Sequence, residues 1–339
     1  MTSASGGITS PPMDQFSAHL DRGWDLVQRG DSAGAELSAR RALEIDSQSP
    51  EAYNLLGYVA AMQGDFEEAV EHYRTAISLD DTYFEAMLNA AEIYIHPLGD
   101  VAEAVNLCDQ ALDLAESDEE RVDALLLKFD AMLADGNVDE AKRLCSTFPR
   151  GPYDNPMHSF LVARAFYESG DVQHAEPLIE AAVKEMSDNP EAWYYLGLIR
   201  DDRGDTITAT RAFLAARELD LLLPPPPWTL TRDTFELTVS QAVQTLPEEL
   251  AQFLRPEEAF VADLPGVEVV ADGVDPRALL LLDGVMSRPG EKPSARLIVY
   301  QRNVERQAGS ISAIPGEILT ALAREITAAF LERPSDVAN

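Results

Sequence analysis

Glycines at a fixed interval constrain the fold of this chain more than any other feature. The interval is 34 residues, or 72 at one place, and an Asp or Asn follows each glycine at Gly30, Gly64, Gly136, Gly170 and Gly204. Glycine ends helices because it adopts the left-handed backbone conformation, and Asp or Asn caps the start of the next helix. The spacing therefore predicts a repeated unit of two helices joined by a tight turn.

Alanines mark where the two helices of each unit pack together. They stand five residues after each glycine, at Ala35, Ala69, Ala141, Ala175 and Ala209. One more unit fits inside the 72-residue interval, with Gly99 at its turn and Ala104 and Ala111 on its second helix. Such hairpins bury their apolar faces only by stacking on one another. We therefore expect six stacked helical hairpins over residues 16–223, after a disordered segment 1–15.

Two segments carry a family resemblance. Residues 50–57 read Pro-Glu-Ala-Tyr-Asn-Leu-Leu-Gly and residues 190–197 read Pro-Glu-Ala-Trp-Tyr-Tyr-Leu-Gly. Together with the spacing, they resemble the tetratricopeptide repeat (TPR) family. The resemblance implies an all-α helical-repeat superhelix, a TPR solenoid. Prolines and missing glycines in repeats three and four predict a local bend there, and Cys108 and Cys145 fall on second helices, where we expect them to be buried.

The TPR resemblance also implies a groove, lined by the first helices, that accepts peptide segments. The side chains on this face are mostly acidic or aromatic, and some family members clamp a C-terminal carboxylate with Lys and Arg that this chain lacks. Acids beside aromatic rings suit a basic or amphipathic segment, although they could equally form a plain solvated face. The predicted groove residues are Trp24, Glu51, Tyr58, Glu92, Asp130, Phe160, Arg164, Tyr167, Tyr194, Asp201 and Asp202, with Glu85, Asp123 and Glu168 on the same face.

The overall charge also favours a partner with a basic segment. The chain has 59 acidic and 26 basic side chains, a formal charge of −33, which disfavours nucleic acid or anionic membrane as a partner. We predict a protein partner with a basic segment. No phosphate-binding glycine loop is present, so we expect no cofactor, and the lack of a signal segment or long apolar stretch predicts a cytoplasmic protein.

Four consecutive prolines at 224–227 end the repeats, so we place a linker at 224–230, a second domain at 231–333 and a tail at 334–339. Apolar spacing predicts helices over 235–246 and 318–329, and β-branched or apolar runs predict strands at 267–270 and 297–300. The apolar run 279–282 is of uncertain type. This order of elements indicates a small α+β domain.

Several short blocks of the second domain resemble a bacterial zincin-like metallopeptidase family. They are residues 246–250, 273–277, 283–285 and 298–306, in that order. In that family the terminal helix carries His-Glu-x-x-His, whose histidines bind zinc and whose glutamate acts as general base. At the corresponding place this chain has Arg324-Glu325-Ile326-Thr327-Ala328.

This departure removes the zinc ligands. Neither the guanidinium of Arg324 nor the methyl group of Ala328 has a lone pair for a metal, and no His or Cys follows His174. We therefore predict no bound metal and no peptidase activity, and we interpret Glu325 as a structural residue that pairs with Arg324 or a neighbour.

The main hypothesis is a non-catalytic interaction scaffold, an acidic TPR groove joined to a protease-like domain without zinc ligands. Two alternatives stay open. One is a metal-dependent hydrolase with a non-standard site, and the other is a structural subunit whose repeats self-associate.

Overall fold

The computed structural model describes residues 12–286 and 293–331. The chain divides into two compact units, Met1–Ala182 and Val183–Asn339. The predicted tail 334–339, and residues 1–11 of the predicted disordered segment, lie outside the described residues, whereas residues 12–15 already belong to the first helix.

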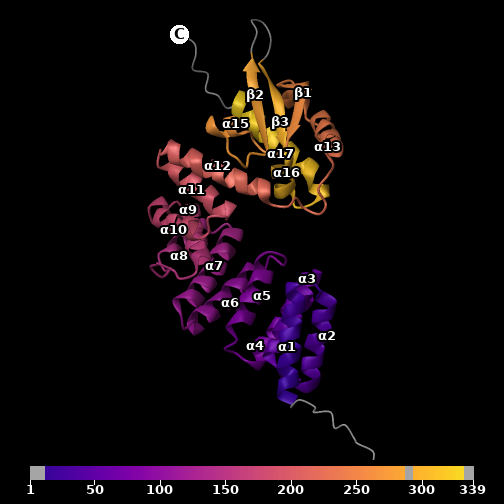
Figure 1. The fold of residues 1–339 in the computed structure, drawn as a ribbon, viewed down its shortest axis with the longest axis vertical. Helices are drawn as coiled ribbons and strands as arrows, with labels where there is room; N and C mark the ends of the chain where they lie inside the picture. The colour runs from indigo at the N-terminus through magenta and orange to yellow at the C-terminus, as the bar shows by residue number, and fades with distance from the viewer. Residues whose placement is uncertain (1–11, 287–292, 332–339) are drawn as a thin grey trace, which may run out of the picture. The chain divides into compact units, whose positions relative to one another are not determined.

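The first unit consists of consecutive helical hairpins (Figure 1). Their helices are α1 (Pro12–Gln28), α2 (Ser32–Ile45), α3 (Pro50–Gln63), α4 (Phe66–Leu79), α5 (Phe84–Ile95), α6 (Val101–Leu114), α7 (Asp118–Ala134), α8 (Val138–Cys145), α9 (Pro156–Glu168) and α10 (Val172–Glu185), the last of which extends slightly past the division. In the first four hairpins, each first helix contacts its own second helix and the first helix of the next hairpin, as in α1 with α2 and α3.

The local signals act as predicted. Gly64 ends α3 in the left-handed conformation with φ 85°, and the Asp31 carboxylate accepts a hydrogen bond from the Gly34 amide at the start of α2. Ala35 and Ala69 are fully buried where second helices pack. The cysteines are buried as expected, and burial raises the pKa of the Cys108 thiol to about 12.

Repeat four is the irregular one. Its second helix, α8, has 8 residues, against 14 in α2, α4 and α6. Residues 146–155 then run without a regular helix, and Phe148 within them is buried against the core. The prolines at 149, 152 and 156 explain this, because proline cannot donate the backbone hydrogen bond that a continuing helix needs.

The second unit starts with a further hairpin, α11 (Pro190–Asp202) and α12 (Thr206–Leu222), and continues into an α+β part. The helices of this part are α13 (Arg232–Gln244), α14 (Glu248–Ala251), α15 (Val267–Ala271), α16 (Gln301–Ala308) and α17 (Ile314–Ile326), and a short 3-10 turn, η1 (Ile311–Ala313), precedes α17. Its strands are β1 (Leu254–Ala262), β2 (Leu280–Met286) and β3 (Ser294–Tyr300).

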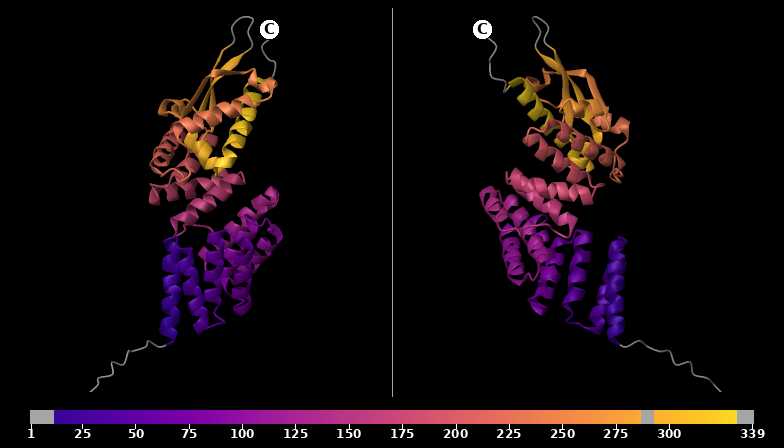
Figure 2. Two further views of the ribbon diagram at one scale, coloured as in Figure 1. Left: turned by 90° about the vertical axis from the view of Figure 1, so that its right-hand side faces the viewer. Right: turned by 60° about the vertical axis from the view of Figure 1, so that its left-hand side comes forward.

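The three strands form a sheet in the order β1-β3-β2, with β1 parallel and β2 antiparallel to β3. Helices α13 and α17 pack on each other and contact β1 and β2 respectively (Figure 2). Their shared core includes Phe235, Leu297, Ile318 and Leu322, each no more than 1% exposed.

Several helices and strands predicted from the sequence lie in the α+β part. The helix expected at 235–246, the strand at 297–300 and the terminal helix are confirmed as α13, β3 and α17, with α17 followed by a π-helical turn, η2, over Thr327–Leu331. The strand expected at 267–270 is wrong, since this segment is helix α15. Its valines are typical of a strand, but they pack as one helical turn in which Val270 is 1% exposed.

The division between the units does not fall in the proline run. It lies at 182/183, so the last helical hairpin groups with the α+β part, whereas the sequence suggested a boundary at 224–230. The contact of α12 with α15 is one reason for this grouping.

Candidate functional site

The first helices of neighbouring repeats in the first unit are joined by polar contacts between equivalent positions. Asn89 donates from Nδ2 to Oδ1 of Asn54, 3.0 Å away and 35 residues earlier in the chain. Asn54 in turn donates to the hydroxyl of Tyr83 at 3.2 Å, and burial raises the pKa of this tyrosine to about 12. These contacts hold α3 and α5 in register.

Further along the same face, three of the predicted acids have basic partners. Asp123 lies 2.9 Å from Nε2 of His158, whose side chain is 7% exposed. Arg164 lies 3.5 Å from Asp130 and 3.7 Å from Glu168. Burial raises the pKa of Asp130, and Arg164 partly opposes this. These three carboxylates therefore already have partners within the unit.

A pocket opens between α3 and α5. Its volume is about 250 Å³, and it is lined by Tyr58, Ala61, Met62, Tyr73, Asn89, Glu92 and Ile93. Tyr58 and Met62 are 39% and 41% exposed, whereas Tyr73 is 1% exposed and lies at the base, where burial raises its pKa. Among the described residues, the exposed Glu92 carboxylate has no hydrogen-bond or ion-pair partner.

The ring of Trp24 does not line this pocket but packs against Tyr58. Its centroid lies 5.5 Å from that of Tyr58 at an interplanar angle of 68°, an edge-to-face contact. Glu51, at the start of α3, accepts a hydrogen bond from the Ser49 hydroxyl at 2.7 Å. The pocket thus combines two aromatic rings, a thioether and a free carboxylate.

The remaining predicted groove residues fall into different environments. Phe160 is 5% exposed and packs in the core, so it offers little surface to a ligand. Tyr167 is half-buried, and Asp201 and Asp202 are exposed at the C-terminal end of α11. In the second unit, Tyr194 donates its hydroxyl proton to Asp275 at 2.8 Å, and the guanidinium of Arg277 lies 4.3 Å from its ring centroid.

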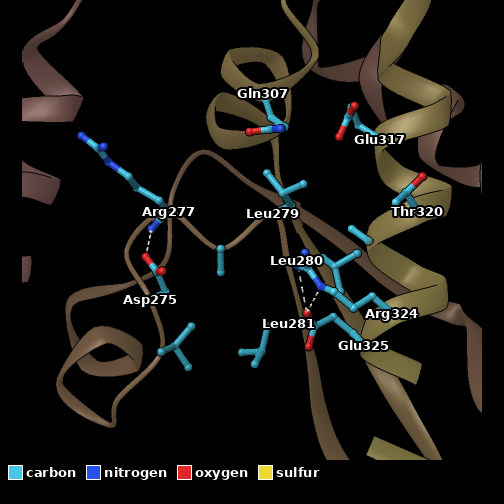
Figure 3. Close-up of a pocket in the computed structure, with 13 residues that line it drawn as sticks. Asp275, Arg277, Leu279, Leu280, Leu281, Gln307, Glu317, Thr320, Arg324 and Glu325 are labelled. Atoms are coloured by element: carbon cyan, nitrogen blue, oxygen red, sulfur yellow. Dashed lines mark hydrogen bonds and ion pairs between the residues drawn. The ribbon is translucent and has the colours of Figure 1, made fainter. Parts of the chain in front are cut away.

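A second, larger pocket of about 680 Å³ lies beside α17 in the second unit (Figure 3). Glu317, Thr320, Arg324 and Glu325 line it from α17, and Leu280 and Leu281 line it from β2. Arg324 donates from Nε to its sequence neighbour Glu325 at 3.0 Å, and both side chains are exposed. Ala328 follows in the π-helical turn η2.

Over residues 12–286 and 293–331, no three His, Cys, Asp or Glu side chains are grouped in a way that could hold a metal ion. Within the same residues, no helix has both the length and the apolar character needed to cross a membrane.

Comparison with known families assigns the helical hairpins. Tetratricopeptide repeat family models match residues 20–84 and 161–220, and another matches residues 86–122. The hairpins within these residues are tetratricopeptide repeats, whereas α8 and most of α7 lie outside the matched residues.

Solved TPR-like structures agree with this assignment at the level of the fold. PilF of Pseudomonas aeruginosa superposes with a TM-score of 0.52 at 20% identity, over 61% of this chain and 93% of that chain. PilW, described as a type IV pilus biogenesis factor, gives a TM-score of 0.50 at 16% identity, over 60% of this chain and 92% of that chain.

Two curated relatives are longer proteins. Mouse Superkiller complex protein 3 is 24% identical over 270 residues, 77% of this chain, and human Tetratricopeptide repeat protein 7B is 28% identical over 152 residues, 44% of this chain. The chain spans 17% of the length of each.

Sequence reasoning assigned Trp24, Tyr58 and Glu92 to the TPR face but missed the residues that complete the pocket at Tyr58 and Glu92. Met62 and Asn89 are neither charged nor aromatic, so their residue types alone do not mark them as binding residues. The hydrogen bond between Asn54 and Asn89 joins residues 35 positions apart, close to the repeat length of 34, so polar residues about one repeat apart are the signal that indicates it.

Proposed function

We propose that this protein is a non-catalytic protein–protein interaction scaffold whose TPR face binds a basic or amphipathic segment of a partner. The observation that carries this proposal is the pocket between α3 and α5, where exposed Tyr58 and Met62 stand beside the unpaired carboxylate of Glu92. A volume of about 250 Å³ suits one side chain rather than a small-molecule substrate.

The chemistry of this pocket selects a side chain with an apolar stem and a cationic end. Lys and Arg lay their methylene groups along apolar surface while the charge stays near a polar partner. The Tyr58 ring attracts a cation through its π face, and Glu92 supplies the counter-charge. Met62 adapts its shape to different stems because its thioether chain is flexible.

The rest of the same TPR face supports a basic partner less directly. Asp123 and Asp130 already pair with His158 and Arg164, so they contribute less attraction than their number in the sequence suggested. In the first unit, further contacts remain possible at Trp24, Glu51 and Glu85. In the second unit, Asp201 and Asp202 are separate candidates for electrostatic steering of the partner.

A peptide array tests this proposal. Fifteen-residue peptides that alternate Lys or Arg with apolar residues are screened against the full chain, and the best binder is measured by fluorescence anisotropy at low and high salt. We expect Tyr58→Ala to weaken binding about tenfold, and Glu92→Gln to weaken it roughly fivefold and to reduce the salt dependence.

Glu67→Gln is the matched control, since Glu67 is an exposed acid in the first turn of the neighbouring helix α4 and does not line the pocket. Equal losses of peptide affinity in Glu67→Gln and Glu92→Gln would mean that binding depends only on the total charge of the protein. That result would exclude the pocket as the binding site.

We further propose that the α+β part is zincin-like in ancestry and has no peptidase activity. The support is chemical: Arg324 and Ala328 stand where the resembling family has zinc-binding histidines, and Glu325 is engaged by Arg324. Elemental analysis of the purified chain tests this. A stoichiometric transition metal that is lost in Glu325→Gln, together with peptide hydrolysis, would contradict it.

A further inference from the structure

One carboxylate of the last repeat is buried against the α+β part. Asp220, near the C-terminal end of α12, has a side chain that is 1% exposed. Arg306 of α16 places its two terminal nitrogens 3.0 Å from the two Asp220 oxygens, and Arg277 donates to the same oxygens at 3.3 and 3.5 Å. A buried carboxylate needs such charge-assisted partners, because it has lost its hydration.

Arg277 connects this buried carboxylate to the first helix of the same repeat. It donates from a terminal nitrogen to Glu191 of α11 at 2.8 Å, and its guanidinium lies 4.3 Å from the ring centroid of Tyr194. Its side chain is only 15% exposed. Figure 3 shows that this side chain points away from the pocket beside α17. The guanidinium therefore meets two carboxylates and an aromatic ring of one repeat.

Hydrogen bonds fix the backbone on both sides of Arg277. Asp275 accepts hydrogen bonds from the Arg277 amide at 2.7 Å and from the Tyr194 hydroxyl at 2.8 Å. From the other side, Asn303 of α16 donates to the carbonyls of Pro276 and Ala278 at 3.0 and 2.8 Å. The turn at residues 275–278 is thus fixed at both ends, and the side chain of Arg277 extends from it to α11.

The end of α12 receives a second arginine from the α+β part. Arg302 of α16 donates to the carbonyls of Asp220, Leu221 and Leu223 at 3.4, 3.1 and 3.3 Å. The last carbonyls of a helix lack partners within the helix and carry partial negative charge, so a guanidinium stabilises them. These contacts add to the attachment of α16 to the end of α12.

We propose that residues 275–277 are a resident ligand of the last TPR, with Arg277 as a tethered guanidinium that fills the Glu191, Tyr194 and Asp220 site. This site is then closed to outside partners, and Tyr194 belongs to it rather than to the partner-binding surface. This site is specific for arginine, because only a planar guanidinium can donate hydrogen bonds to two carboxylates while it stacks on an aromatic ring. This inference does not rest on the pocket between α3 and α5.

Chemical rescue in the full-length chain tests this proposal. We expect Arg277→Ala to lower the melting temperature of the second unit by roughly 10 °C, because Asp220 loses a buried partner. Ethylguanidinium, used below the concentration that destabilises the wild-type chain, should raise the melting temperature of this variant by about 3 °C, and ethylammonium should not. Arg211→Ala, which removes an exposed arginine of the same helix α12, is the control and should not respond to either additive.

No recovery with either additive, or equal recovery with both, would overturn the proposal. If Arg277→Ala does not fold, Arg277→Lys is compared with the wild type by amide hydrogen exchange. We expect the rate of amide hydrogen exchange in α11 and in residues 273–279 to rise about tenfold, because lysine keeps the charge but lacks the planar guanidinium. Unchanged exchange in both segments would show that the site does not require a guanidinium.

Discussion

At Gly57 the first helix of repeat two has no room for a side chain. A Cβ built on this residue would lie 2.6 Å from the ring of Tyr73, which is itself 1% exposed. The ring cannot move away, because α4 holds it against the core of neighbouring repeats. In the last repeat, Gly197 stands in the same relation to Phe213, with a distance of 2.4 Å. The close approach of the two helices in a repeat is therefore decided by single residues.

We predict that Gly57→Ala destabilises the first unit by about 1 to 3 kcal/mol, because the added methyl group overpacks the contact with Tyr73. Urea unfolding followed by circular dichroism measures the change. Gly316→Ala is the comparison, since a Cβ at this helical position of α17 meets nothing within 4 Å and should be neutral or slightly stabilising. Similar losses in both variants would contradict the steric argument.

At the scale of elements, the chain uses different signals for its helices and its strands. Helix ends are marked locally: Ser117 accepts a hydrogen bond from the Glu120 amide while the Glu120 side chain accepts one from the Ser117 amide. Strand β1 has no comparable mark, because Arg-Pro-Glu-Glu at 255–258 interrupts its apolar pattern. It is a strand because it pairs with β3 at the edge of the sheet, where proline is tolerated.

The capping box at the start of α7 leads to a prediction for this element. Ser117→Ala should cost about 1 kcal/mol of stability, because the Glu120 amide loses its acceptor. The measurement is urea unfolding of the full chain. Ser47→Ala, an exposed position in the turn between α2 and α3, should change stability by less than about 0.5 kcal/mol. A loss at Ser47 as large as that at Ser117 would show that the cap is not the cause.

At the scale of the whole molecule, the last repeat belongs with the α+β part and not with the other repeats. The contacts of Asp220 with Arg277 and Arg306 join segments that are 57 and 86 residues apart. Arg217 adds a hydrogen bond to the Pro265 carbonyl at 2.5 Å. The proline run at 224–227 therefore links two parts of one folded unit, even though prolines of this kind often mark a domain boundary.

This grouping predicts how fragments behave. A fragment of residues 187–339 should fold and unfold cooperatively, whereas a fragment of residues 224–339 should be unfolded or much less stable, because its arginines have lost Asp220 and the end of α12. Thermal circular dichroism and limited proteolysis of both fragments check this. Equal stability of the two fragments would place the boundary in the proline run after all.

The amino-acid sequence by itself determined the helical hairpins, their turns and their number, because glycine conformation, capping and alanine packing act over a few residues. It also determined that no His or Cys follows His174. Only the tertiary structure decided that 267–271 is a helix, that 254–262 is a strand, and that Asp130 and Tyr194 already have partners. These outcomes depend on which distant segments pack together, and no local rule connects Tyr194 to a residue 81 positions later in the chain.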